Sequence, residues 1–397
     1  MTKKGENIYK RKDNRWEGRY LKGHNEYGKR QIGYVYGKSY REVKEKLTEA
    51  KEHLEAIPEE IRALPFSCIC AQWLRQQHNT VKQSTYAKYV RLLDTHILTA
   101  FGPLPLSDFT PELIHQFLLE KLEAGRRDGC GGLSSKTVQD IYMILKSVIR
   151  YGELKYKTQL PKPQPYPFPK QEHTILVLSL NEQMRLEHSM RLEPYNLRKL
   201  GILLCLYSGL RIGEICALRW TDIDLNHGIL HVSKTLQRIQ NPVKNSTQRT
   251  VIIESPPKTV SSIRDIPLTN NILSILSPFE SLHNQNVYFL TGLSDHYIEP
   301  RNYQYFFRRC LELLDIPPVN FHCLRHTFAT RCIEVGFDVK TLSEILGHSN
   351  VSITLNHYVH SSIEMKRRQM ELLFSCHPLQ KDCTASENRL SWDYERT

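Results

Sequence analysis

An alternating run of prolines constrains this chain more than any other local feature. Every second residue from 161 to 169 is proline. Proline has a fixed φ and no backbone N–H, so neither a helix nor a central strand can continue through this segment. We therefore expect residues 158–173 to form an extended, stiff linker between domains. With 397 residues, the chain is long enough for two or three domains.

The N-terminal segment is strongly basic and rich in aromatic side chains. Residues 1–41 contain 12 Lys and Arg against 4 Asp and Glu, and the whole chain has a net charge of +12. Aromatic residues recur there between glycines, which predicts short strands and turns, and Ser39 is placed to cap a helix that ends near Leu54. Basic segments of this kind often bind nucleic acid, and a solvated surface is the simpler alternative. We interpret residues 1–57 as a small β-sheet plus a helix.

The rest of the chain is predicted to be mostly helical. Residues 64–157 carry apolar side chains at helical spacing, after serines that are suited to capping, which indicates a compact bundle. Residues 174–374 combine helices with three predicted strands, at 229–236, 247–254 and 263–267. Residues 375–397 form a polar tail without a core pattern. The expected fold class is multi-domain and mainly α, with small β-sheets.

Composition argues against several classes of protein. No stretch approaches the roughly 20 apolar residues that a membrane span needs, and the first residues are charged instead of forming an apolar signal core. We therefore expect a cytoplasmic protein. The ten cysteines include no Cys-x-x-Cys pair, and no glycine-rich nucleotide fingerprint occurs. Reduced thiols, no bound metal and no cofactor are expected.

Four local patterns follow one another in the predicted third domain. They are Ser208-Gly-Leu-Arg211-Ile-Gly-Glu214, Lys258-Thr259 before Ile263-Arg264-Asp265-Ile266-Pro267, His322-Cys-Leu-Arg325-His326-Thr327, and Leu346-Gly347-His348 with Tyr358 ten residues later. The ordered set resembles the tyrosine recombinase, or phage integrase, family. The third pattern is similar to the HxxRH box of that family, and the fourth is similar to its LGH box and nucleophilic tyrosine.

The resemblance extends beyond these boxes. It covers residues 175–370 as a mixed α+β catalytic domain and residues 64–157 as a helical core-binding domain. The first 55 residues resemble the three-stranded arm-type DNA-binding domain of integrases from conjugative transposons and temperate phages of Gram-positive bacteria. The resemblance implies a site-specific recombinase that integrates and excises a mobile element through a 3′-phosphotyrosine intermediate.

The chemistry of phosphodiester cleavage suggests a separate role for each of these residues. Tyr358 would attack phosphorus, and a free tyrosine, with a pKa of about 10, needs a positive environment and a proton acceptor. Arg211 and Arg325 would clamp the phosphate oxygens, because guanidinium groups bind them two at a time. Glu214, one turn after Arg211, would hold that arginine in place, and a simple surface ion pair is the alternative.

Proton transfer and further phosphate contacts would come from three other residues. His322 shares a helical face with Arg325 and would take or return the tyrosine proton. His326 is expected to point elsewhere, either to support the catalytic residues indirectly or to pack. His348 would donate a hydrogen bond to the phosphate. Lys258, in a turn between strands, would protonate the leaving 5′ oxygen. Two other lysines compete for this last role, Lys234 and Lys244.

The family resemblance also implies partners. Double-stranded DNA would be bound at core sites and at separate arm sites, and recombination of two duplexes would need a homotetramer. An accessory excisionase or a host DNA-bending protein would assist, on nucleoid DNA in the bacterial cytoplasm, with no membrane partner. A predicted helix at residues 361–373 would dock on a neighbouring protomer, or equally on its own domain.

Three other functions compete with this hypothesis. A type IB topoisomerase shares the covalent tyrosine chemistry, but the basic N-terminal segment and the LGH box favour a recombinase. A regulator with an inactive catalytic fold is disfavoured because all six catalytic positions hold the expected residue types. A metal protein could use the histidines near the two boxes, but Arg325 between His322 and His326 would repel a cation. Those histidines are His322, His326, His348, His357 and His360.

Overall fold

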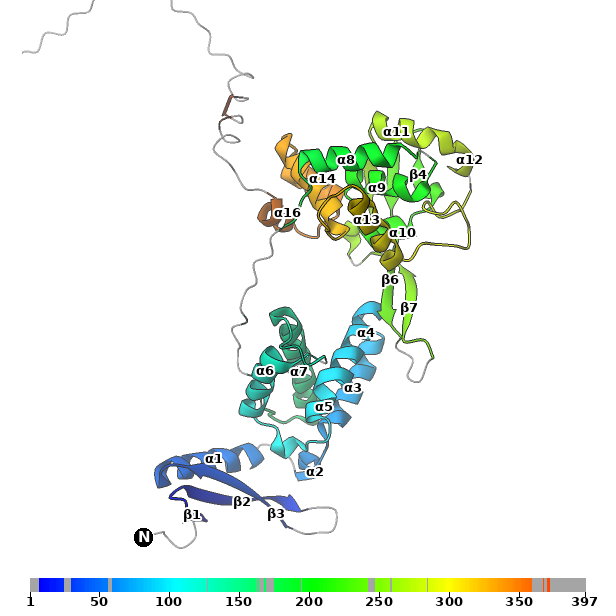
Figure 1. The fold of residues 1–397 in the computed structure, drawn as a ribbon. Coiled ribbons are helices and arrows are strands. Elements are labelled where there is room, and N and C mark those ends of the chain that lie inside the picture. Colours follow the sequence, from blue (N-terminus) through cyan, green and yellow to red (C-terminus); the bar gives the residue numbers. More distant parts are fainter. Residues whose placement is uncertain are drawn as a thin grey trace, which may run out of the picture. The chain divides into compact units, whose positions relative to one another are not determined.

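The computed structural model divides the chain into two compact units, residues 1–174 with 236–255, and residues 175–235 with 256–397 (Figure 1). The structure describes residues 7–24, 30–55, 59–126, 128–161, 163, 168, 175–193, 195–241, 247–257, 259–283, 285–358, 367, 370 and 371. Two expectations therefore lie largely outside the described residues, the polar tail and the helix at 361–373. None of the helices in the described ranges is both long and apolar enough to span a membrane.

The N-terminal sheet and helix form as predicted. The strands β1 (Ile8–Lys10), β2 (Trp16–His24) and β3 (Arg30–Gly37) are antiparallel in the order β1-β2-β3, and α1 (Tyr40–Glu55) packs on one face. Ser39 accepts a hydrogen bond from the Glu42 backbone N–H, so it caps α1. A Cβ at Gly18 would lie 2.9 Å from side chains of Val35 and Val43, so a glycine is required where the helix meets the sheet.

A helical bundle follows, as the apolar spacing predicted. Its helices are α2 (Glu59–Arg62), α3 (Phe66–His78), α4 (Gln83–Leu92), a π-helical turn (Leu93–Ile97), α5 (Leu98–Phe101), α6 (Pro111–Ala124) and α7 (Ser135–Tyr156). Thr110 and Ser134 cap α6 and α7 through their hydroxyl groups. Leu160, at the start of the predicted linker, is buried in this core.

One predicted strand is wrong in its extent. Residues 229–236 are split between β5 (Ile229–Val232) and β6 (Thr235–Gln240), which belong to different sheets. β6 forms a hairpin with β7 (Thr250–Ser255). Thr235 and Leu236 are both buried, which breaks the alternation of a single strand, so the chain changes sheets at this point.

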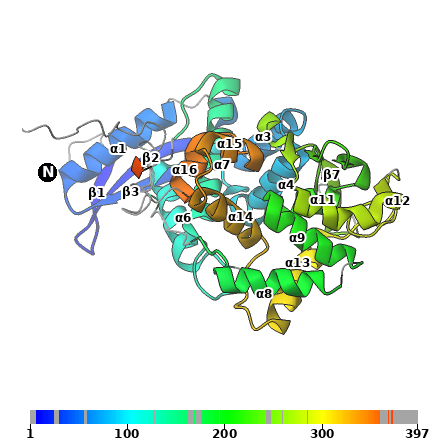
Figure 2. The same cartoon turned by 90° about the horizontal axis from the view of Figure 1, so that it is seen from above.

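The second unit is built around a buried helix. α9 (Leu197–Ser208) is apolar over most of its surface, and α8 (Leu180–Arg191) and α14 (His322–Glu334) both pack against it (Figure 2). The same unit contains a three-stranded antiparallel sheet in the order β4-β5-β8. In this sheet β5 lies between β4 (Ile223–Asp224) and β8 (Arg264–Pro267). The remaining helices are α10 (Ile212–Ala217), α11 (Asn270–Leu276), α12 (Glu280–His283), α13 (Pro300–Leu313), α15 (Val339–Leu346) and α16 (Val351–Tyr358).

Candidate active site

Arg211 lies at a sharp turn between two helices. α9 ends at Gly209, which adopts a φ of 65°, and Arg211 then forms the N-cap of α10. A Cβ at Gly209 would lie 2.7 Å from Phe328 and 2.8 Å from Leu346, so both the backbone conformation and the close packing require glycine. The turn therefore directs Arg211 toward the end of α15.

Glu214 holds Arg211 at two points, as the spacing suggested. Its Oε1 lies 2.6 Å from Arg211 Nη1, and its Oε2 accepts the Arg211 backbone N–H at 3.0 Å. Arg211 Nη2 also donates to the carbonyl of Gly347 at 3.2 Å. The side chain of Arg211 keeps 32% of its surface exposed, whereas that of Glu214 keeps 3%. The carboxylate of Glu214 is therefore buried, whereas the guanidinium of Arg211 remains partly accessible to solvent.

Arg325 reaches the same turn from α14 and is almost fully buried. Its Nη1 donates to the carbonyl of Gly209 at 2.8 Å, and its Nη2 donates to that of Leu346 at 2.6 Å. Burial, followed by the charge of Arg211, lowers the pKa of Arg325 to about 9. The guanidinium remains charged at neutral pH, and the two arginines repel each other in the absence of an anion.

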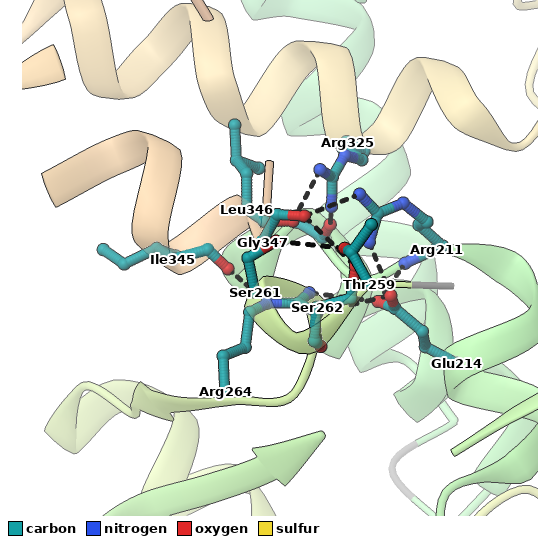
Figure 3. Close-up of polar contacts among 11 residues, drawn as sticks. Arg211, Glu214, Thr259, Ser261, Ser262, Arg264, Arg325, Ile345, Leu346 and Gly347 are labelled. Atoms are coloured by element: carbon teal, nitrogen blue, oxygen red, sulfur yellow. Dashed lines mark hydrogen bonds and ion pairs between the residues drawn. The ribbon is translucent and has the colours of Figure 1, made fainter. Parts of the chain in front are cut away.

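A third arginine, which the sequence did not suggest for the site, completes the cluster (Figure 3). Arg264 on β8 contacts both carboxylate oxygens of Glu214, at 3.3 Å from Nη1 and 3.0 Å from Nη2, and donates through Nε to the carbonyl of Ile345. Burial raises the pKa of Glu214, but the charges of Arg264 and Arg211 outweigh it and keep that pKa below its usual value. Strand alternation, which places Arg264 on the buried side with Ile266, was the available sequence signal.

His348 follows the turn at Gly347, whose φ of 65° ends α15. Its backbone N–H donates to the carbonyl of Ser343 at 3.0 Å. Its Nδ1 lies 2.8 Å from the hydroxyl oxygen of Thr354, which is fully buried. The ring is therefore held through Nδ1, and Nε2 is directed away from Thr354.

Tyr358 ends α16, and its hydroxyl contacts a residue that was expected to point elsewhere. The Tyr358 Oη lies 2.7 Å from Nδ1 of His326, and the side chain is buried. The expected direction of His326 was wrong because residues four apart on a helix also share a face, so His322 and His326 both lie on this side of α14, with ring centroids 4.9 Å apart. Burial raises the pKa of Tyr358, and the charges of Arg325 and Arg211 oppose this effect.

His322 lies beside His326 and is more exposed to solvent than either His326 or Tyr358. Part of its side chain is exposed to solvent, and the rest is desolvated by the surrounding protein. This desolvation, followed by the charges of Arg325, His326 and Arg211, lowers the pKa of His322 to about 4. The imidazole is therefore neutral at physiological pH. It can accept or donate one hydrogen bond at each ring nitrogen, according to its tautomer.

Lys258 lies outside the described residues, as does its competitor Lys244, whereas Lys234 lies between β5 and β6. The residues that follow Lys258 are described. Thr259 Oγ1 lies 2.9 Å from the hydroxyl of Ser262, which in turn donates to the carbonyl of Gly347 at 3.4 Å. The segment next to Lys258 is thus joined to the turn that Arg211 contacts.

A metal site is not evident in the described part of the chain. No group of three or more His, Cys, Asp or Glu side chains is arranged there to hold a metal ion. This statement does not cover two of the histidines that were considered as metal ligands, because His360 and the side chain of His357 lie outside the part of the chain that the structure describes.

Comparison with known proteins identifies the family. A model described as the phage integrase family matches residues 177–365, and a model described as the phage integrase N-terminal SAM-like domain matches residues 66–122. A XerC-like tyrosine recombinase of Caldanaerobacter subterraneus is 30% identical over 264 residues, which are 61% of this chain and 66% of that protein. The transposase of transposon Tn916 from Enterococcus faecalis is 27% identical over 187 residues, 43% of this chain and 44% of the transposase.

Solved structures share the fold. The integrase of transposon Tn1549, in complex with a circular intermediate DNA, has a TM-score of 0.60 at 22% identity and covers 78% of this chain and 99% of its own. A lambda integrase tetramer bound to a Holliday junction has a TM-score of 0.55 at 17% identity, over 90% of this chain and 98% of its own.

Together, the fold and the family matches define a tyrosine recombinase, a class of enzyme that cleaves and rejoins DNA. The chain belongs to the phage integrase family, since the two family models together cover more than half of it. This confirms the family that the four sequence patterns indicated.

Proposed function

We propose that the chain is the site-specific integrase of a mobile element, and that it cleaves DNA through a 3′-phosphotyrosine at Tyr358. One observation carries the proposal. Arg211, Arg325 and the segment next to Lys258 all contact the turn at residues 345–347, and Tyr358 belongs to the same buried cluster as Leu346 of that turn. A phosphate at this turn would meet two guanidinium groups and a tyrosine hydroxyl.

The arginines would bind the non-bridging oxygens, where negative charge grows during attack at phosphorus. Their hydrogen bonds to backbone carbonyls fix their positions before DNA arrives, so little reorganisation is needed at the moment of reaction. Each such donor contributes roughly 3–4 kcal/mol to stabilisation of the transition state. His348, held through Nδ1 by Thr354, would donate a further hydrogen bond from Nε2.

The reaction is a phosphoryl transfer from DNA to tyrosine and back. Tyr358 Oη attacks phosphorus, the bond from phosphorus to the 5′ oxygen breaks, and Lys258 supplies the proton for that oxygen. The phosphotyrosine keeps the energy of the broken bond, so a DNA 5′-hydroxyl reseals the strand by the reverse reaction. This cycle explains how strands can be rejoined without a nucleotide cofactor.

The N-terminal sheet supplies a second DNA-binding face. Along β2, Gly18 faces α1, so the alternate residues Glu17 and Arg19 face away from it. The guanidinium of Arg19 lies 5.2 Å from the ring centroid of Tyr9 and 5.7 Å from that of Tyr34, and both rings are about half exposed. On this basis and on the family resemblance we assign residues 1–57 to arm-site binding. We assign residues 64–157 to core-site binding on the family resemblance alone.

The assembly that we propose is a homotetramer on DNA, because two duplexes contain four strands to cut. The lambda integrase structure on a Holliday junction is a tetramer, which supports this arrangement. The enzyme would act on nucleoid DNA in the bacterial cytoplasm, assisted by an excisionase or a DNA-bending protein.

Covalent trapping tests the proposal directly. The full-length protein and its Tyr358→Phe variant are mixed with nicked duplexes that tile the DNA flanking its own gene, in the presence of EDTA. We expect a protein–DNA species that survives SDS and is destroyed by protease, with the wild type only. A species that persists in the variant would assign the reaction to another tyrosine. Specific binding without any covalent species would instead indicate an inactive DNA-binding protein.

A further inference from the structure

The contact between His326 and Tyr358 points to a proton path that starts at the nucleophile. The hydroxyl of Tyr358 lies 2.7 Å from His326 Nδ1, which is a normal hydrogen-bond length for a phenol and an imidazole nitrogen. The two residues come from different helices, α14 and α16, so this is a tertiary contact and not a local one. It joins the reacting oxygen to a group that can accept a proton.

We propose that His326 is the general base that accepts the Tyr358 proton during strand cleavage and returns it during rejoining. This inference rests on the proposed function, because it assumes that Tyr358 is the nucleophile. A phenol attacks phosphorus poorly while it keeps its proton, and general-base help typically contributes 10²–10⁴-fold to the rate. His326 touches the atom that must lose the proton, which is the first geometric requirement for such a base.

His322, which was expected from the sequence to take this proton, would instead support His326 as the base. Its ring meets that of His326 edge to face, at a centroid distance of 4.9 Å and an interplanar angle of 87°. Partial burial and the charges of Arg325, His326 and Arg211 keep the pKa of His322 at about 4, so it adds no positive charge of its own beside His326. A protonated His322 would repel the imidazolium that the reaction forms on His326.

The proposed step balances in atoms and charge. The Tyr358 O–H bond breaks as the proton moves to His326 Nδ1, and Oη forms a bond to phosphorus. The bond from phosphorus to the 5′ oxygen breaks, and that oxygen receives a separate proton from the general acid. The imidazolium then lies near the phosphotyrosine, whose negative charge stabilises it. Rejoining reverses each transfer, so His326 returns its proton to the leaving tyrosine oxygen.

An asparagine at position 326 separates proton transfer from simple positioning. Asn Oδ1 can accept the tyrosine hydrogen bond at nearly the place of Nδ1, but it cannot take the proton. We expect full-length His326→Asn to bind the nicked duplexes like the wild type and to form the covalent species about 100-fold to 10,000-fold more slowly. A rate within a few-fold of wild type would overturn the proposal and leave His326 only a positioning role.

A second substrate shows which proton is affected. In a duplex with a 5′-bridging sulfur at the cleaved phosphate, the leaving thiolate needs no general acid, so this substrate rescues variants that lack the acid. We expect Lys258→Ala to be rescued and His326→Asn not to be. Rescue of His326→Asn would place His326 on the leaving-group side and would contradict the proposal.

Two controls keep the result interpretable. If His326→Asn unfolds, His326→Ala is assayed with and without added imidazole, which fits the space of the missing ring. A rate that rises with imidazole supports the proposal, and an unchanged rate overturns it. The wild type and Tyr358→Phe run in parallel. If the wild type forms no covalent species, the proposed function itself fails, whereas a normal wild type with a fast His326→Asn variant removes only the role of His326.

Discussion

Arg264 and Glu214 form a buried ion pair in which two guanidinium nitrogens meet two carboxylate oxygens. Arg264 Nη1 lies 3.3 Å from Glu214 Oε1, and Nη2 lies 3.0 Å from Oε2. The same carboxylate also holds Arg211. The position of Arg211, which is partly exposed and which we propose binds phosphate, is thus set by a buried arginine that we do not expect to touch DNA.

Removal of Arg264 should therefore affect both folding and cleavage. Loss of one partner leaves the Glu214 charge buried with less compensation, which typically costs about 3–5 kcal/mol. We expect Arg264→Ala to lower the free energy of unfolding by that amount in urea titrations and to slow covalent-complex formation. Arg308→Ala is the matched control, since Arg308 pairs with Glu312 at the surface, and it should change stability by less than about 1 kcal/mol. Equal effects of the two variants would contradict this view of the buried pair.

Arg211 and Arg325, the two arginines that we propose bind phosphate, should differ in their effect on stability. Arg211→Ala and Arg325→Ala should each slow cleavage by 10²-fold or more, because each removes a donor to the transition state. Arg325 is buried and donates hydrogen bonds to two backbone carbonyls, so its loss should also destabilise the fold. The side chain of Arg211 keeps 32% of its surface exposed, so its loss should lower the free energy of unfolding by less. Single-turnover cleavage and urea unfolding of both variants test this difference.

Gly209 should not tolerate alanine. A Cβ there combines a positive φ with contacts of 2.7 Å to Phe328 and 2.8 Å to Leu346. Gly129 provides the control, because it has a φ of 70° but no atom within 4 Å of an added Cβ. We expect Gly129→Ala to cost about 1 kcal/mol from backbone strain alone, and Gly209→Ala to cost clearly more. Similar melting temperatures for the two variants would show that the turn can relax.

Acidification should destabilise the protein partly through His322. Its pKa is about 4 in the folded chain, below the usual 6.5, so the unfolded chain binds more protons between these values. Its contribution to stability is present above pH 6.5 and is lost as the pH falls toward 4. Because the ring is partly exposed, solvent screening limits this contribution to about 1–2 kcal/mol. Urea unfolding at pH 7 and pH 5 should show a smaller loss in His322→Gln than in the wild type.

The exposed face of the N-terminal sheet should control arm-site binding. Arg19→Ala removes one cation from between Tyr9 and Tyr34, so we expect weaker binding to arm-site duplexes and a salt dependence reduced by about one phosphate contact. Arg41→Ala is the control, because Arg41 projects from α1 and is almost fully exposed. Binding measured across a salt series separates the two variants. An equal loss in both would indicate that the whole basic segment, and not this face, binds DNA.

The local features of the fold and site were predictable from the sequence. Apolar spacing and capping residues predicted the helical bundle and α1, because these patterns act within a few residues along the chain. The spacing of Glu214 from Arg211 predicted their contact for the same reason. The order of the four patterns indicated the family, which the comparisons confirmed.

Contacts between distant segments were decided only by the tertiary structure. Arg264 meets Glu214 across 50 residues, and His326 meets Tyr358 across 32, so no local periodicity links either pair. The chain also changes sheets between Val232 and Thr235, where a continuous β pattern predicted one strand. Periodicity determines which face of an element is buried. Which side chains share that buried space depends on how the elements pack, and this packing brings Glu214 to Arg264 and Tyr358 to His326.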